Sequence, residues 1–169
     1  MTVENNKDSL VQFMDTSDWD NICDFTLNLK QALDYDGTLV HIDEITARKA
    51  LKWFMHQLNK KIYKRAYRHF GKRLQIVAVL EKSKEGRFHF HAAIEAPSHM
   101  VAIEFCSVAM KLWLEQDFGY DHGMARPNAD RGWIGYMAKN RSKDGLEHYF
   151  DCIDLGSGPI KGIHKQAII

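Results

Sequence analysis

The stretch RFHFHAAIE, residues 87–95, has the alternation of a β-strand whose two faces differ in chemistry. Alternate side chains of a strand share one face of the sheet. The apolar face of this strand carries Phe88, Phe90, Ala92 and Ile94. The opposite face carries Arg87, His89, His91, Ala93 and Glu95. We therefore expect the phenylalanines to supply part of a core and the two histidines to lie on a polar face.

The preceding stretch LQIVAVLE, residues 74–81, is rich in valine and isoleucine, which is typical of a strand. The polar connection KSKEG, residues 82–86, suits a hairpin. Ile76, Ala78 and Leu80 would fill the core side of this strand. In such a hairpin, Glu81 lies on the same face as His89 and His91.

Two imidazoles and one carboxylate on adjacent strands form a three-ligand site that leaves coordination positions open. Such a site suits a divalent metal ion that also takes an oxygen atom from a substrate. A pair of histidines on an exposed sheet surface is the alternative, since the chain has nine histidines. The position of Glu81 on the same predicted face favours the metal site.

The first part of the chain predicts one strand, one turn and one helix. DFTLNLK, residues 24–30, alternates in the manner of a half-buried strand, with Phe25, Leu27 and Leu29 on its apolar side. Asp36-Gly37 is a turn signal. Residues 44–69 have a helical period. The apolar face of this helix consists of Leu51, Phe54, Leu58 and Ile62.

The last part of the chain predicts two more helices. One runs from Ser98, as its N-cap, to about residue 118. Its apolar stripe consists of Val101, Phe105, Val108 and Leu112. Residues 119–127 form a short strand or a loop, and Asn128 caps a helix that continues to residue 140. Residues 146–154 read as a final strand, ended by GSGP.

This order of elements, with an antiparallel hairpin in it, predicts an α+β fold. A central antiparallel sheet would carry its helices on one face and leave the other face open for a ligand. With 169 residues, 45% of them apolar, the chain is long enough for one compact domain with its own core.

Cysteine content and hydropathy bound the location of the protein. The three scattered cysteines have no CxxC spacing, which favours a reducing compartment over a disulfide framework or a zinc knuckle. The N-terminus has no signal-peptide pattern, and no apolar run approaches the about 18 residues of a membrane span. We therefore expect a soluble, intracellular protein with no membrane partner.

Charge is distributed unevenly along the chain, although the formal net charge is only +1. Residues 1–24 carry six acidic side chains and one basic side chain. Residues 60–73 carry no acid and seven basic side chains, which are Lys60, Lys61, Lys64, Arg65, Arg68, Lys72 and Arg73. A patch of this kind can bind polyanions. The alternative is a solvated helix face.

The stretch YMAK places Tyr136 and Lys139 one helical turn apart, on the same helix face. A tyrosine with this cationic neighbour is a candidate nucleophile, because a phenol with a pKa of about 10 needs activation. A tyrosine that only packs against the helix surface is the alternative. Of the six tyrosines, only Tyr136 has a lysine three residues later.

Three motifs in this order resemble the HUH endonuclease superfamily, specifically its single-tyrosine rolling-circle replication initiators. FTLN, residues 25–28, is similar to the first motif of that family. His89-Phe90-His91 is similar to its His-hydrophobic-His motif, and Tyr136 to Lys139 is similar to its YxxK motif. Glu81 stands where viral initiators have a further acidic residue. The resemblance covers residues 24 to about 145.

This resemblance implies a ferredoxin-like or RRM-like HUH fold, with a metal held by Glu81, His89 and His91. Tyr136 would attack single-stranded DNA at a replication origin and form a 5′-phosphotyrosine link, with Lys139 assisting. The metal would be Mg²⁺ or Mn²⁺, with Zn²⁺ as another occupant in a crystal. Candidate DNA contacts are Thr26, Asn28, Lys30, Arg68, Lys72, Arg73 and Arg87.

The same resemblance implies a division of the chain into a polar extension (1–22), an HUH domain (23–155) and a short tail (156–169). Viral relatives continue into a helicase domain for which 169 residues leave no room. We therefore expect a host or separate helicase as partner. The location would be the cytoplasm of a bacterial or archaeal host, or the nucleus for a eukaryotic virus.

Three other readings of these residues remain open. A non-catalytic RNA-binding or single-stranded DNA-binding sheet would need neither metal nor covalent adduct. A His/His/Glu enzyme of another class, such as a non-haem iron oxygenase or a zinc hydrolase, would use redox chemistry or activated water. An α+β domain with surface histidines would have no metal site at all.

Overall fold

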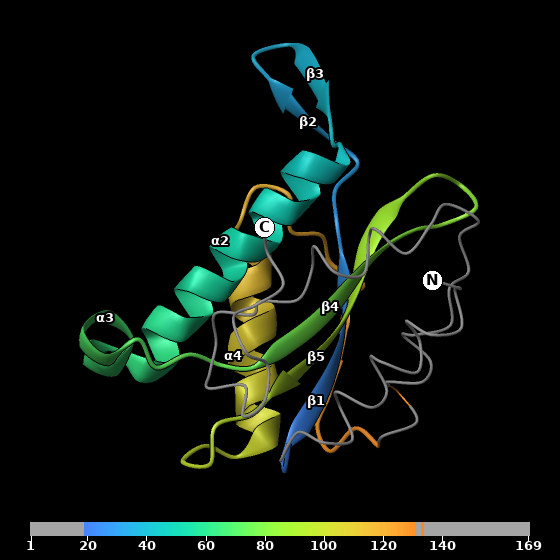
Figure 1. Ribbon diagram of the computed structural model, residues 1–169. Helices are drawn as coiled ribbons and strands as arrows, with labels where there is room; N and C mark the ends of the chain where they lie inside the picture. The colour runs from blue at the N-terminus through green and yellow to red at the C-terminus, as the bar shows by residue number, and fades with distance from the viewer. Residues whose placement is uncertain (1–18, 131–132, 134–169) are drawn as a thin grey trace, which may run out of the picture.

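The computed structural model describes residues 19–130 and residue 133. A four-stranded antiparallel sheet has the order β4-β5-β1-β6 (Figure 1). Its strands are β1 (Ile22–Asn28), β4 (Ile76–Lys82), β5 (Phe88–Glu95) and β6 (Met124–Arg126). The helices described are α2 (Glu44–Tyr63), α3 (Arg65–Phe70) and α4 (Ala102–Leu114). The predicted α+β class with a central antiparallel sheet is confirmed.

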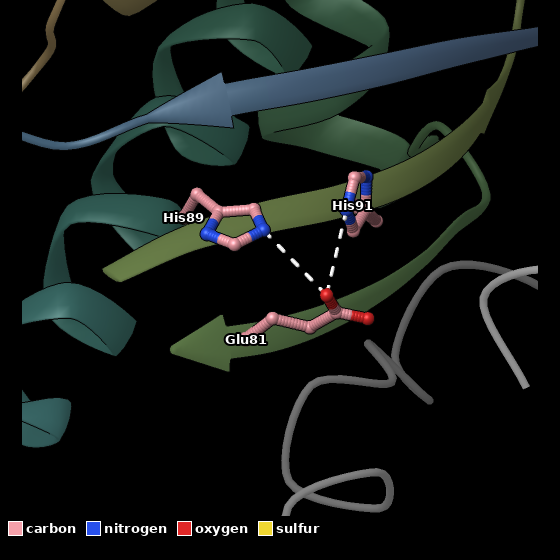
Figure 2. Close-up of side chains that lie close together, drawn as sticks. All are labelled: Glu81, His89 and His91. Atoms are coloured by element: carbon pink, nitrogen blue, oxygen red, sulfur yellow. Dashed lines mark ion pairs between the residues drawn. The ribbon is translucent and has the colours of Figure 1, made fainter. Parts of the chain in front are cut away.

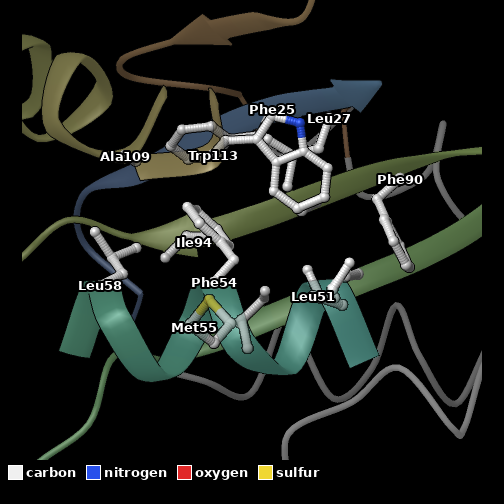
Figure 3. Close-up of a cluster of buried hydrophobic side chains, with 14 of the residues drawn as sticks. Phe25, Leu27, Leu51, Phe54, Met55, Leu58, Phe90, Ile94, Ala109 and Trp113 are labelled. Atoms are coloured by element: carbon white, nitrogen blue, oxygen red, sulfur yellow. The ribbon is translucent and has the colours of Figure 1, made fainter. Parts of the chain in front are cut away.

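The core lies between one face of the sheet and the helices α2 and α4. Figure 3 shows Phe25, Leu27, Phe90 and Ile94 of the sheet pointing toward Phe54 of α2 and Trp113 of α4. The Phe54 and Trp113 rings meet edge to face, with centroids 5.4 Å apart. The alternation in residues 24–30 and 87–95 therefore predicted the core face of both strands correctly.

The helix predicted over residues 44–69 is broken at Lys64. This residue has φ 47°, a left-handed value that is rare for residues with a Cβ, and α2 ends before it. Leu51, Phe54 and Leu58 are buried as predicted, and Ile62 is half-buried. No residue of α3 is buried. Because the apolar face ends at Ile62, the core no longer holds the chain to the direction of α2.

A hairpin that the sequence did not predict connects β1 to α2. Its strands are β2 (Ala32–Tyr35) and β3 (Thr38–His41), and it extends away from the body at the start of α2 (Figure 1). Asp36 and Gly37 have φ 51° and 84°, the two positive values that a type I′ hairpin turn requires. No residue of β2 or β3 is buried, so hydrophobic alternation gives no signal for these strands.

The helix predicted from Ser98 begins later, because Pro97 and Met100 close a turn first (N–H to O, 3.0 Å). The N-cap of α4 is Val101, which is exposed instead of buried. The apolar stripe is consequently rotated. Its buried members are Phe105, Cys106, Ala109 and Trp113, while Val108 and Leu112 are half-buried.

Residues 119–127 contain the short strand β6, as predicted. Asn128 has φ 56° and does not act as an N-cap, whereas Asp130 accepts the Trp133 N–H through Oδ1 (3.2 Å). The rest of the predicted helix to residue 140 and the predicted strand 146–154 lie outside the described residues. Among the residues described, no helix has the length and apolarity that a membrane span requires.

A buried amide joins the end of α2 to the start of β4. Asn59 donates to Met55 O (2.7 Å), and its Oδ1 accepts the Leu74 N–H (2.7 Å). Asn59 is 2% exposed, so water cannot replace either contact readily. This link positions the segment that leads from α3 into the edge strand of the sheet.

Replacing Asn59 with alanine leaves the Leu74 N–H without its buried acceptor. We expect Asn59→Ala to lower the free energy of unfolding by about 1–3 kcal/mol. Gln57→Ala on the same helix is the control, with an expected change within about 0.5 kcal/mol. Urea denaturation followed by circular dichroism measures both. Equal midpoints for Asn59→Ala and the wild type would contradict the role given to this amide.

Candidate metal centre

The strand register brings Glu81, His89 and His91 to one face of the sheet. Glu81 of β4 lies directly opposite His89 of β5, and Val79 lies opposite His91. On the other side of β5, His89 faces Asn28 and His91 faces Thr26 of β1. All of these positions alternate with residues of the core face, so their side chains lie on the face opposite α2 and α4.

The three side chains converge at the end of β4 and the beginning of β5. Figure 2 shows them pointing toward one another from the two strands. Glu81 Oε2 is 3.5 Å from His89 Nε2 and 3.6 Å from His91 Nε2. One ligand atom from each residue lies within 4.8 Å of the others. The group is therefore compact enough to hold one ion.

Contacts on the far side of each imidazole leave its Nε2 directed at Glu81. His91 Nδ1 is 3.4 Å from the Thr26 hydroxyl, and His89 Nδ1 is 3.4 Å from the carbonyl of Arg87. A carbonyl oxygen only accepts, so this contact favours the His89 tautomer with the proton on Nδ1. Nε2 then keeps its lone pair for a metal.

The donor set fits a divalent cation. Donor atoms about 2.1 Å from one ion lie about 3.0–3.4 Å apart at octahedral or tetrahedral angles. The Oε2–Nε2 distances of 3.5 and 3.6 Å need only small side-chain movements to reach this range. Three protein ligands leave positions for oxygen atoms of a substrate or water. Imidazole and carboxylate together do not select a single metal.

The face that carries this group is not evenly exposed. Toward the start of β4, Val77 and Val79 are buried, and so is Ala93 of β5. The side chains of Glu81 and His89 keep about a fifth of their surface, at 20% and 19%. A substrate would consequently reach the metal ligands from the Glu81 end of β4.

Two residues missed from the sequence pattern lie beside this group. Arg126 of β6 donates to Oδ2 of buried Asp24 in β1 through Nε (2.8 Å) and Nη2 (2.5 Å). This hydrogen bond is the main cause of the raised pKa of the Arg126 guanidinium. Asp24 lies on the same strand face as Thr26, so an acid inside an apolar strand was the available signal.

Trp133 links this ion pair to the histidines. The Arg126 guanidinium lies over the Trp133 ring at 5.4 Å, and the same ring meets His91 nearly edge to face, with centroids 5.4 Å apart. The chain is therefore at the metal centre three residues before Tyr136. Tyr136 and Lys139 themselves lie outside the described residues.

The predicted DNA contacts divide into two groups. Thr26, Asn28 and Arg87 adjoin the histidines, as the register and the Arg87 carbonyl contact show. Lys30 follows β1 and donates its N–H to Phe118 O (2.9 Å). The remaining three, Arg68, Lys72 and Arg73, lie on or just after α3, at the opposite end of β4 from Glu81 (Figure 1).

Comparison with known proteins places the chain among replication proteins. Residues 28–145 match the model of the replication-associated protein family of the ORF2 type. The chain belongs to this family. The match spans more than half of the chain and includes the metal-centre residues as well as Tyr136 and Lys139. No curated protein and no solved structure matches the chain. Membership of the family supports a role as a replication initiator.

Removal of the anionic ligand should abolish tight metal binding. We expect Glu81→Gln to weaken Mn²⁺ binding by more than the about 10–100-fold that loss of a supporting residue costs. Glu85→Gln is a matched control, because Glu85 is exposed in the same hairpin connection and bonds Ser83. Equilibrium dialysis with Mn²⁺ measures both. Equal affinities would show that these residues do not form the metal centre.

The Thr26 hydroxyl should support the ligand geometry of His91. We expect Thr26→Val to lower Mn²⁺ affinity about tenfold, because the near-isosteric valine removes only the contact to Nδ1. Thr26→Ser keeps the hydroxyl and should bind close to the wild type. Calorimetric titration compares the three proteins. Equal weakening by valine and serine would assign the effect to packing instead.

Proposed function

We propose that this protein nicks and rejoins single-stranded DNA at a replication origin, as an HUH endonuclease with Tyr136 as its nucleophile. The observation that carries this proposal is the convergence of Glu81, His89 and His91 within 4.8 Å on one sheet face. The family supplies the replication context, since it consists of replication-associated proteins. Non-haem iron or zinc hydrolase chemistry would account for the ligands but not for this context.

The chemistry assigns one role to each part of the centre. A divalent ion such as Mg²⁺ or Mn²⁺, when bound, supplies charge neutralisation at the scissile phosphate. Glu81, His89 and His91 hold it, and Thr26 and the Arg87 carbonyl orient the two imidazoles. Asn28, next to His89 in the register, is a candidate contact for the phosphate of the bound strand.

Tyr136 is the proposed nucleophile. Its phenol oxygen attacks phosphorus and the bond from phosphorus to the 3′-oxygen breaks. The phenol proton is lost to solvent, and the departing 3′-oxygen takes up one proton to become a free hydroxyl. Lys139 stabilises the phenolate or the phosphate. The contact of Trp133 with His91 supports this assignment, because three residues span at most about 11 Å.

Rejoining is the same reaction in reverse. A 3′-hydroxyl attacks the phosphotyrosine, which restores the phosphodiester and frees Tyr136. The energy of the broken bond is kept in the covalent link, so neither step consumes ATP. Unwinding of the duplex ahead of the free 3′-end would be the task of a separate or host helicase.

Replacement of the nucleophile should abolish the covalent link. We expect the wild type with Mn²⁺ and labelled origin-containing single-stranded DNA to give a slower band on a denaturing gel. Tyr136→Phe should reduce this band at least about a thousandfold, since no hydroxyl remains to attack. Tyr120→Phe, at an exposed position, is the matched control and should retain the adduct.

The outcomes separate the competing functions. An adduct that persists in Tyr136→Phe would identify a different nucleophile. Metal-dependent cleavage without an adduct would indicate a hydrolase that activates water. Binding of nucleic acid that neither Mn²⁺ nor Glu81→Gln affects, with no cleavage of origin DNA, would indicate a non-catalytic binding domain.

A further inference from the structure

A basic surface surrounds α3, away from the metal centre. It consists of Lys60, Lys61, Lys64, Arg65, Arg68, Lys72 and Arg73, and we call it the α3 surface. All seven side chains are exposed. Within residues 19–130 and 133, no carboxylate forms an ion pair with any of them. Seven uncompensated cations in one place repel each other, which favours an anionic ligand.

The fold does not need these charges for its own packing. No residue of α3 is buried, and the helix begins after the left-handed Lys64. Two of the cations are nevertheless held in place: Lys72 lies over the Tyr63 ring at 4.9 Å and Arg73 over the Tyr67 ring at 5.4 Å. Tyr67 is held in turn by His56 (2.8 Å). The α3 surface is thus partly ordered.

An exposed aromatic side chain stands among these cations. Phe70, the last residue of α3, is 85% exposed, more than any other exposed large hydrophobic side chain of the described residues. A phenylalanine on a basic surface offers a ring for a base to stack on, which is the usual recognition of single strands. Duplex DNA offers no such free base face.

The edge strand β4 separates this surface from the metal centre. Arg73 precedes β4, and Glu81 lies near its other end. The five steps from Ile76 to Glu81 span about 17 Å in a strand. The eight steps from Arg73 to Glu81 span at most about 29 Å. At about 3.4 Å per stacked nucleotide, these limits correspond to about 5–9 nucleotides.

We propose that the α3 surface, with Phe70, is a second binding site that holds single-stranded DNA flanking the cleaved phosphate. Binding there needs no metal, since the site contains only cations and an aromatic ring. The opposite end of α2 has the opposite charge, because Asp34, Asp36, Asp43 and Glu44 are exposed there. The strand would therefore leave the metal centre along β4 toward α3 and not along the β2–β3 hairpin. This inference rests on the proposed nicking of single-stranded DNA.

Binding measured in EDTA tests the site without any cleavage. The probe is a labelled single-stranded oligonucleotide of mixed sequence, beside the same sequence as a duplex. We expect Phe70→Ala to weaken single-strand binding about 5–100-fold. Arg65→Gln/Arg68→Gln should also weaken it and lower the slope of log K against log salt by about 1.4. Lys49→Gln/Lys111→Gln makes the same charge change at exposed positions on α2 and α4 and should have little effect.

A length series tests the spacing. Origin oligonucleotides with 3′- or 5′-flanks of increasing length should gain affinity in the wild type once one flank reaches about 5–9 nucleotides. Phe70→Ala should lose this gain. The adduct formed at saturating concentration of the shortest cleavable oligonucleotide should be unchanged, because the reacting groups are distant. A wild type that forms no adduct counts against the proposed function, whereas binding in EDTA judges the α3 surface alone.

Three results would overturn the proposal. Equal effects of the Arg65/Arg68 pair and the Lys49/Lys111 control pair would reduce the binding to overall charge. Equal affinity for duplex and single strand, with no effect of Phe70→Ala, would assign the surface to duplex DNA. Loss of adduct from the shortest oligonucleotide in the variants of the α3 surface would make α3 part of the cleavage site.

Discussion

The antiparallel register of β4 and β5 is the constraint on which both the core and the metal centre depend. It sets Glu81 opposite His89 and Leu80 opposite Phe90. A slip of one residue would exchange the faces of one strand and separate the carboxylate from the imidazoles. The connection fixes this register: Ser83 N–H bonds Arg87 O, and Gly86, at φ 80°, returns its N–H to Ser83 O.

β1 completes the centre from the other side of β5, and its position is fixed separately. The Gln31 side chain accepts the Phe88 N–H (2.8 Å) and donates to Phe88 O (3.2 Å), which ties the end of β1 to the start of β5. Trp113 Nε1 donates to Asn28 O (2.9 Å) from α4. The helices therefore position β1, and β1 in turn presents Thr26 to His91.

Strand alternation was enough to predict the core face of β1 and β5 and the common face of Glu81, His89 and His91. It failed where burial does not shape the sequence. The β2–β3 hairpin has no buried face, and Lys64 breaks a helix whose apolar stripe had already ended. Ser98 resembles an N-cap, but the turn from Pro97 to Met100 takes its place. The Arg126–Asp24 pair joins residues 102 positions apart, a relation that local periodicity does not contain.

The two faces of the sheet place different demands on the same strands. On the core face, a residue is held by volume and apolarity, and a register error costs packing. On the other face, Glu81 and the histidines form only weak ion pairs until a cation joins them, so their convergence adds little to stability by itself. The apolar face therefore supplies the rigidity that keeps the three polar ligands together. A metal centre built this way sits on β4, which also leads directly from α3, so the spacing between the α3 surface and the ligands is set by one stiff strand and not by a flexible linker.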